Sequence, residues 1–362
     1  MQIGIVGLPN VGKSTLFNSL TKSAAAQAEN YAFCTIDPNT GIVEVPDLRI
    51  KAISDLVKPQ KTIYTNIEIV DIAGLVKGAN QGEGLGNKFL ANIRECHAIA
   101  QVIRNFENKN ITHVYDNVNP QRDIEIIETE LILADLQTIE KKIETSTKDI
   151  KAKKDNAKER FEFFNNLKSH LEKGVKASSF NYEKDQLPWL QECHLLSFKP
   201  IIYIINVDEN ELANFQENEC KKNLGLQEKD IVVPICAQLE ADLADMSDDE
   251  ILQFLADFGI KDTGRSNLIK KSYELLGLQT FFTAGEKEVR AWTFQKGWLA
   301  PQCAGVIHSD FEKDFICTDI IPWQDFVENQ GWIKAKENGK IRTEGKDYQM
   351  QDGDICFFKC RK

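Results

Sequence analysis

The sequence predicts an α/β fold: a mainly parallel sheet into which a pair of long antiparallel helices is inserted, followed by a small β-rich domain. Three observations predict it. Short apolar runs alternate with helical stretches, one long segment lacks any strand signal, and β-rich runs separated by turns close the chain. Strands that alternate with helices are typical of a parallel sheet covered on both faces. We expect strands at residues 2–7, 62–71, 98–102, 201–205 and 231–235, and a helix at 13–20.

The segment from Asp123 to about Lys173 contains neither glycine nor proline. Apolar residues recur in it at helical spacing in two stripes, Ile132 to Ile143 and Ala157 to Leu171. Polar residues around 145–154 separate the stripes, which indicates a turn between two helices. We interpret residues 123–195 as a coiled-coil-like helical arm inserted into the α/β domain. The alternative is two helices that lie flat on the sheet.

Size and composition indicate a soluble multi-domain protein. At 362 residues the chain is too long for one ordinary core, so two or three domains are expected. The N-terminus lacks the basic start and apolar stretch of a secretory signal, and no apolar run is long enough to cross a bilayer. The nine cysteines show no C-x-x-C spacing, so we expect reduced thiols in a cytoplasmic protein.

Charge is distributed unevenly along the chain. The net charge of −11 argues against a protein that coats nucleic acid with its whole surface. Residues 141–160 nevertheless carry eight Lys or Arg against four Asp or Glu. Such a run is usually a solvated helix face, and contact with RNA is the second interpretation.

A glycine-rich sequence follows the first expected strand and precedes the first expected helix. Gly7-Leu8-Pro9-Asn10-Val11-Gly12-Lys13-Ser14-Thr15 matches the pattern G-x-x-x-x-G-K-[ST] of a P-loop. Backbone N–H groups of such a loop surround phosphates, and the helix N-terminus adds a partial positive charge. We expect Lys13 to reach the β- and γ-phosphates and Ser14 to bind Mg²⁺. The phosphate-binding candidates are Asn10, Val11, Gly12, Lys13, Ser14 and Thr15.

Two further positions match the switch regions of nucleotide hydrolases. Asp71-Ile72-Ala73-Gly74 ends an apolar strand, as D-x-x-G does in such proteins. Asp71 is expected to hold Mg²⁺ through water, and the Gly74 amide to sense the γ-phosphate. Thr35 lies where the first switch loop should be and is the natural second Mg²⁺ ligand. The expected metal ligands are therefore Ser14, Thr35 and Asp71.

The residue that should orient the attacking water is missing. Leu75 stands where Ras-type enzymes carry glutamine, and an aliphatic side chain cannot hydrogen-bond water. Unaided turnover should therefore be slow, and another group must orient the nucleophile. His97 and His113 are candidates by chemistry, with His113 preferred because it lies in an expected loop near the site. A group supplied by a partner is the competing explanation.

The purine pocket departs from the guanine-reading pattern N-K-x-D. The strand at 201–205 is followed by Asn206-Val207-Asp208-Glu209, so Val207 replaces the lysine and Glu209 the aspartate. Losing a buried hydrogen-bonded pair costs about 1–3 kcal/mol per unsatisfied group, which weakens guanine preference. Asn206 and backbone atoms near Val207 could meet adenine instead. The residues indicate weakened GTP selectivity without proving ATP selectivity.

These motifs together resemble the YchF family, the Obg-like ATPases of the translation-factor-related P-loop class. The resemblance is carried by 7–15, by 30–39 (NYAFCTIDPN), by 71–90 (DIAGLVKGANQGEGLGNKFL) and by 285–292 (GEKEVRAW). It implies an Obg-type nucleotide-binding domain at 1–277, interrupted by the arm at 123–195, and a β-grasp TGS domain at 278–361. It also implies a slow Mg²⁺-dependent ATPase, with backbone atoms at Val207 contacting adenine, that associates with ribosomes.

The resemblance adds one cation and leaves other functions to be weighed. Asn10 matches the P-loop asparagine that helps to hold K⁺ in related cation-dependent members, so K⁺ is a candidate second cation. A GTP-specific translation or assembly factor of the same fold is the alternative, and it would need Glu209 to act as the aspartate does. A metabolic kinase would need phosphate-binding arginines, and arginine is sparse. We expect a monomer by default.

Overall fold

The computed structural model describes residues 1–25, 39–72, 87–108, 111, 113–115, 117–257, 260 and 262–361. The chain divides into two compact units. The first comprises Met1–Ile42 and Glu68–Asn267, and the second comprises Val43–Ile67 and Leu268–Lys362. The segment 43–67 therefore belongs to the same unit as the C-terminal residues, from which it is separated by two hundred positions in the sequence. No helix in the described residues is long and apolar enough to span a membrane.

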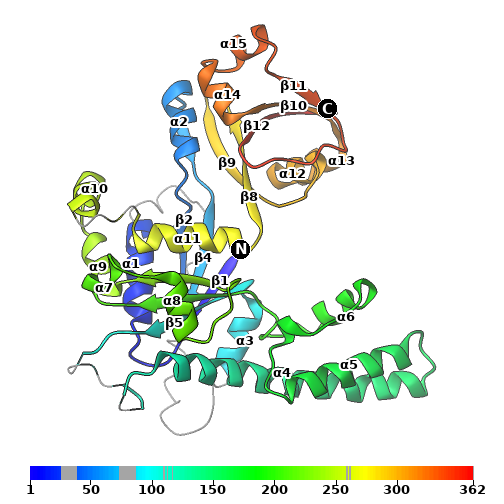
Figure 1. Ribbon diagram of the computed structural model, residues 1–362. Helices are drawn as coiled ribbons and strands as arrows, with labels where there is room; N and C mark the ends of the chain where they lie inside the picture. Colours follow the sequence, from blue (N-terminus) through cyan, green and yellow to red (C-terminus); the bar gives the residue numbers. More distant parts are fainter. Residues whose placement is uncertain are drawn as a thin grey trace. The chain divides into compact units, whose positions relative to one another are not determined.

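The first sheet has the strand order β2-β4-β1-β5-β6-β7 (Figure 1). Its strands are β1 (Gln2–Val6), β2 (Thr40–Glu44), β4 (Asn66–Asp71), β5 (Ala98–Arg104), β6 (Ile201–Asn206) and β7 (Ile231–Ile235). The four pairs from β4 to β7 are parallel, which confirms the predicted sheet. All residues of β5 are buried, because a parallel sheet is covered on both faces. The carboxyl ends of these strands share one edge, so the segments that follow them can form one site.

The helices of the first unit lie between these strands or follow the last of them. They are α1 (Lys13–Ala25), α3 (Asn87–Glu95), α4 (Pro120–Lys151), α5 (Ala157–Leu171), α6 (Leu187–Gln191), α7 (Glu209–Leu212), α8 (Glu217–Asn223), α9 (Ala237–Leu243) and α10 (Asp248–Asp257). α11 (Gly264–Leu275) begins in the first unit and continues into the second, which resumes at Leu268. α4 begins with Asn119, whose side chain accepts from the Arg122 N–H, and with Pro120 at its first position. Proline is tolerated there because its missing N–H would have had no partner in the helix.

The predicted antiparallel helical arm is confirmed. α4 and α5 pack side by side in opposite directions (Figure 1). The predicted apolar stripes meet in a cluster that contains Ile132, Ile139, Phe164 and Leu167. The segment that follows α5 adds a third layer to this cluster with Leu190, Phe180 and Trp189. The two helices are therefore held by a core of their own, and the sequence had not predicted its third layer.

The expected single strand at 62–71 is corrected to two strands in two sheets. β3 (Lys61–Ile63) pairs with β9 (Glu288–Gln295) of a second sheet, and β4 pairs with β1 of the first. Between them, Thr65 O accepts from the Val45 N–H at 2.9 Å. The residues have continuous strand propensity, so the sequence alone did not reveal where the chain leaves one sheet for the other.

The second unit is built on a mixed sheet with the order β11-β10-β12-β8-β9-β3. Its further strands are β8 (Leu278–Ala284), β9 (Glu288–Gln295), β10 (Phe315–Pro322), β11 (Arg342–Glu344) and β12 (Asp354–Cys360). β8 and β9 form a hairpin, β12 runs parallel to β8, and β10 is antiparallel to β12. In a β-grasp fold, a β-hairpin is followed by a helix and then by a strand that runs parallel to the first strand of the hairpin. β8, β9, the helix at 300–307 and β12 have this order, as the resemblance implied.

Both faces of this sheet are covered. Phe281, Phe294 and Ile320 pack with Cys303 and Ala304 of α12 (Ala300–Ile307). On the other face, Phe282 and Ile355 pack with Ile50 and Ile53 of α2 (Leu48–Val57). The remaining helices of the unit are α13 (Ser309–Lys313), α14 (Trp323–Glu328) and α15 (Trp332–Glu337). The segment 43–67 thus supplies both a helix and an edge strand to this core.

Candidate nucleotide-binding site

The backbone of the glycine-rich loop requires glycine at positions 7 and 12. Gly12 has φ +99°, and a Cβ added there would lie 2.4 Å from Nδ2 of Asn206. A Cβ added at Gly7 would lie 2.4 Å from the Val102 carbonyl oxygen. Asn10 also has positive φ, at 62°. The loop leads directly into α1, whose first N–H groups have no partner within the helix and are suited to an anion.

The side chains at the start of α1 differ in their exposure. Lys13 is 7% exposed, and Ser14 and Thr15 are exposed. The Lys13 ammonium donates to the Leu8 carbonyl oxygen across the loop. Burial lowers the pKa of Lys13 to about 8, and the charge of Asp71 partly opposes this shift. A lysine held over its own loop in this way is poised to exchange a carbonyl for phosphate oxygens.

Asp71 lies beside the loop at the end of β4. It pairs with Ile5 of β1 and is 6% exposed. Its charge raises the pKa of Lys13, so the carboxylate lies near enough to favour the ammonium. No group of three or more His, Cys, Asp or Glu among the described residues could hold a metal ion. An Mg²⁺ site shared by a carboxylate, hydroxyls and phosphate oxygens fits this donor set. Thr35, Gly74 and Leu75 lie outside the described residues.

Asn206 joins three loops at the carboxyl edge of the sheet. Its Nδ2 donates to the Val11 carbonyl oxygen at 2.9 Å, and its Oδ1 accepts from the Ala237 N–H at 3.0 Å. The side chain is 4% exposed. Both ends of the amide are therefore engaged in holding the P-loop against the segments after β6 and β7. This geometry gives Asn206 a positioning role and leaves little of its amide for direct contact with a base.

Val207 and Glu209, which were both expected at the purine pocket, differ in burial. The Val207 side chain is 2% exposed and belongs to a core cluster with Ile103 and Leu224. It therefore packs inside the protein, whereas a lysine in its place would have covered a base. The Val207 N–H donates to the Ile235 carbonyl oxygen at 2.9 Å. Glu209 is exposed at the first position of α7.

The two candidate histidines lie in different places. His97 precedes β5 and its Nδ1 accepts from the Gln2 N–H at 3.1 Å, at the amino edge of the sheet. The P-loop lies at the carboxyl edge, so His97, the less favoured of the two candidates, is not placed to orient the attacking water. His113 follows β5 at the correct edge and is 5% exposed. Both of its ring nitrogens are engaged, with Asp123 and with the Tyr115 N–H. Its role in hydrolysis stays a prediction.

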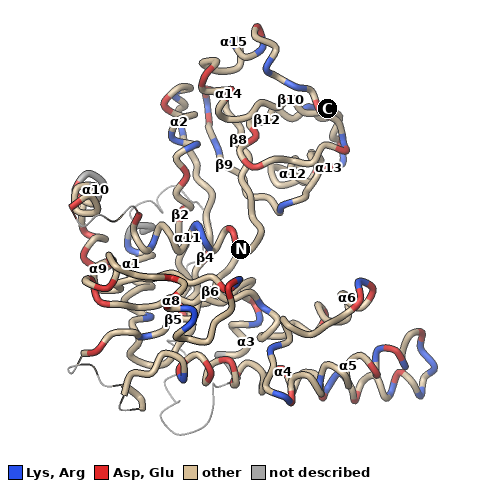
Figure 2. The backbone as a smooth tube through the Cα atoms, viewed as in Figure 1, with Lys and Arg blue, Asp and Glu red and all other residues tan. Residues whose placement is uncertain are grey.

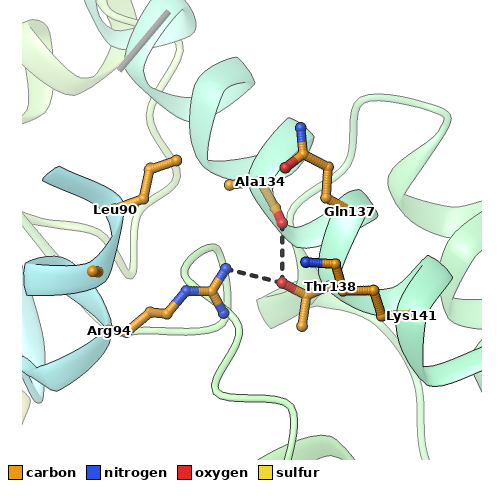
Figure 3. Close-up of a pocket in the computed structure, with 7 residues that line it drawn as sticks. Leu90, Arg94, Ala134, Gln137, Thr138 and Lys141 are labelled. Atoms are coloured by element: carbon orange, nitrogen blue, oxygen red, sulfur yellow. Dashed lines mark hydrogen bonds between the residues drawn. The ribbon is translucent and has the colours of Figure 1, made fainter. Parts of the chain in front are cut away.

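A joint between α3 and α4 was not predicted from the sequence. Leu90, Ala91 and Arg94 of α3 face Ala134, Gln137, Thr138 and Lys141 of α4 across a pocket of about 150 Å³ (Figure 3). Arg94 donates to Thr138 Oγ1 at 2.9 Å. One turn away, Asp135 accepts from the backbone N–H groups of Leu196 and Ser197, both at 2.8 Å. The Arg94–Thr138 bond thus joins α3, the helix that follows the D-x-x-G segment, to the arm.

Comparison with known proteins places this geometry in a family. A model described as a 50S ribosome-binding GTPase matches residues 2–135, and the YchF C-terminal model, described as a protein of unknown function, matches 278–361. The ribosome-binding ATPase YchF of Bacillus subtilis is 50% identical over 359 residues, with 98% of both chains covered. The chain belongs to the YchF family.

Other members of the YchF family agree with this assignment. The ribosome-binding ATPase YchF of Pasteurella multocida is 49% identical, with 98% of both chains covered. A structure titled as the YchF GTPase of Schizosaccharomyces pombe superposes with a TM-score of 0.89 at 35% identity. That comparison covers 99% of this chain and 97% of the other. The predicted resemblance to the YchF family is confirmed over nearly the full length.

Proposed function

We propose that this chain is a slow Mg²⁺-dependent ATPase that acts as a switch and associates with the ribosome. The observation that carries the ATP assignment is the purine pocket. Val207 packs in the core where the guanine-reading pattern has lysine, and the longer Glu209 replaces the aspartate, which displaces the carboxylate that should pair with guanine. A guanine would leave its N1–H and amino group without the acceptor they need. Relatives named as ribosome-binding ATPases support the same assignment.

The phosphate end of the nucleotide is assigned to the P-loop. Backbone N–H groups of Asn10 to Thr15 surround the phosphates, and Lys13 neutralises the β- and γ-phosphates. Ser14, Thr35 and Asp71 hold Mg²⁺, and the Gly74 amide contacts the γ-phosphate. The metal draws negative charge from the phosphoryl oxygens when bound. Asn206 keeps the P-loop in register with the base pocket, where backbone atoms near Val207 contact adenine and Glu209 lies at the rim.

Slow hydrolysis follows from the lack of a water-orienting side chain at position 75. Leu75 cannot do so, and we assign this task to His113, which lies at the carboxyl edge of the sheet after β5. The buried position of His113 means that it must leave its hydrogen bonds before it can act. Lys13 and His113 are thus the proposed catalytic residues. Asn10, with its left-handed backbone, is the proposed K⁺ ligand.

The ribosome is the proposed partner, in the cytoplasm, and the arm is the proposed contact with RNA. Basic residues gather where α4 ends and α5 begins (Figure 2). Among them, Lys151, Lys153 and Lys158 are exposed, and Lys154 pairs with Asp149. Phosphate contacts of this kind depend strongly on salt. Retention of the chain on ribosomes should therefore fall steeply as salt rises, and a monomer is sufficient for this contact.

Two experiments test the proposal. Replacing Lys13 with alanine should abolish hydrolysis while the fold persists, and unchanged turnover would refute the site. Equilibrium competition between labelled ATP and GTP, with and without purified ribosomes, tests the base. A GTPase of the same fold is the second candidate, because the S. pombe structure and the 2–135 family model both carry that name. Binding of GTP alone would establish it.

A further inference from the structure

A buried polar contact that the sequence did not reveal lies where the arm begins. His113 Nε2 is 2.9 Å from Asp123 Oδ2, and the two side chains are 2% and 3% exposed. The Tyr115 N–H donates to His113 Nδ1 at 3.2 Å. Because Nδ1 accepts, the ring proton sits on Nε2 and is donated to the carboxylate. The imidazole therefore has no free nitrogen with which to reach a water molecule.

Asp123 belongs to the first turn of the helical arm. It follows the cap at Asn119 and Pro120, and its backbone N–H donates to the Asn119 carbonyl oxygen at 3.1 Å. Any displacement of the start of α4 must therefore move the carboxylate that holds His113. The contact is a direct link between the arm and the histidine proposed to act in hydrolysis.

Arg122 gives the carboxylate a second partner. Its Nη2 and Nε lie 3.1 and 3.3 Å from Asp123 Oδ1. A buried carboxylate that loses its only partner is strongly destabilised. Here Asp123 would stay paired if the imidazole left, so release of His113 costs less than in an isolated pair. Arg122 also donates to Asn117 O at 2.8 Å and stacks on the Tyr115 ring. One arginine thus holds both the carboxylate and the turn that covers Nδ1.

We propose that the His113–Asp123 pair is a latch through which the arm restrains hydrolysis. While the latch is closed, the imidazole is stored in a buried position and turnover is slow. A displacement of the first turn of α4 opens the latch and frees His113 to orient the attacking water. This proposal rests on the proposed role of His113 in hydrolysis. If Asp123 instead positioned His113 for catalysis, removal of its carboxylate would lower kcat.

The test compares full-length variants in steady-state ATP hydrolysis. Asp123→Ala removes the acceptor and should raise kcat by about tenfold, the equivalent of one lost charge-assisted hydrogen bond. Asp123→Asn keeps a neutral acceptor of the same size and should raise kcat by a smaller factor, about threefold. Gln121→Ala is the matched control. It lies in the same turn, its side-chain amide donates to Glu125 Oε1 at 3.0 Å, and it should leave kcat unchanged.

Further variants separate the latch from the assignment on which it rests. His113→Ala should lower kcat, and adding Asp123→Ala to it should produce no rise. A rise in the double variant would show that the gain bypasses His113 and would overturn the latch. A fall in kcat with Asp123→Asn, at unchanged nucleotide affinity, would overturn it too. If His113→Ala alone keeps the wild-type rate, the proposed catalytic role of His113 fails, which is a different result.

Hydrogen exchange checks that the effect is local. Amides in the turn after His113 should exchange faster in Asp123→Ala than in the wild type, while amides of β5 and β6 keep their protection. If Asp123→Ala also loses protection in the sheet, its effect is not local. The exchange of Asp123→Asn, whose side chain has the size of aspartate, then decides whether opening of the turn alone follows from loss of the carboxylate. Unchanged exchange in the turn of both variants would contradict the latch.

Discussion

Asn206 offers the sharpest quantitative test of how the nucleotide site is held together. Its amide bonds two backbone groups that are themselves buried, the Val11 carbonyl and the Ala237 N–H. Asn206→Ala leaves both without a partner. Each unsatisfied buried group costs about 1–3 kcal/mol. Because the two loops can relax partly toward water, we expect the free energy of unfolding to fall by about 2–4 kcal/mol.

The same change should weaken nucleotide binding. The P-loop loses the contact that sets its distance from the segment after β7, and misplaced N–H groups bind phosphate less well. A loss of about 1.4 kcal/mol corresponds to a tenfold rise in the dissociation constant, which is the least we expect. Urea unfolding followed by far-ultraviolet circular dichroism measures the stability, and titration with a fluorescent ATP analogue measures the affinity.

Two comparison variants make the result specific. Asn206→Asp keeps the acceptor for the Ala237 N–H but sets a carboxylate against the Val11 carbonyl, so it should bind nucleotide no better than the alanine variant. Asn214→Ala is the control, since its exposed amide makes only a 3.4 Å contact with Asn210. If Asn206→Ala changes the unfolding free energy by less than about 0.5 kcal/mol, as surface changes do, the positioning argument is refuted.

Four further predictions concern proton uptake, pH-dependent stability, packing and base choice. Because burial lowers the pKa of Lys13 to about 8 and polyphosphate favours its ammonium, binding should take up a proton above pH 8, detectable by calorimetry in two buffers. The same shift means that the unfolded state binds more protons between pH 8 and 10.5, so the empty protein should gain stability as pH rises through that window. Ile50→Ala should cost about 2–5 kcal/mol in thermal unfolding, whereas Leu48→Ala, at an exposed position, should cost little. Glu209→Asp should improve GTP competition against ATP, and unchanged selectivity would show that the base argument is wrong.

The order of elements in the first unit could be predicted because the signals are local. An apolar run before Gly7 and helical spacing after Lys13 specify a strand, a loop and a helix within twenty residues. The arm was predictable for the same reason, since its two apolar stripes have helical spacing. The P-loop candidates follow from chemistry that the backbone of this short segment supplies by itself.

The candidate site was only partly predictable because its remaining contacts are long-range. Asn206 and Val11 are far apart in the sequence, and nothing in either segment indicates that one amide joins them. Val207 looked like a residue of the purine pocket until the structure placed it in the core. His97 was a candidate by chemistry for orienting the attacking water, but strand direction puts it at the wrong edge of the sheet.

What the sequence determined alone was the identity of local elements and of the phosphate-binding loop, because helical periodicity, strand propensity and glycine requirements act over a few residues. Tertiary structure decided which elements share a core. It assigned residues 43–67 to the compact unit of the C-terminal residues, joined α3 to the arm through Arg94, and buried His113 against Asp123. Such contacts depend on which side chains meet when distant segments pack, and that is settled only by the free energy of the whole fold.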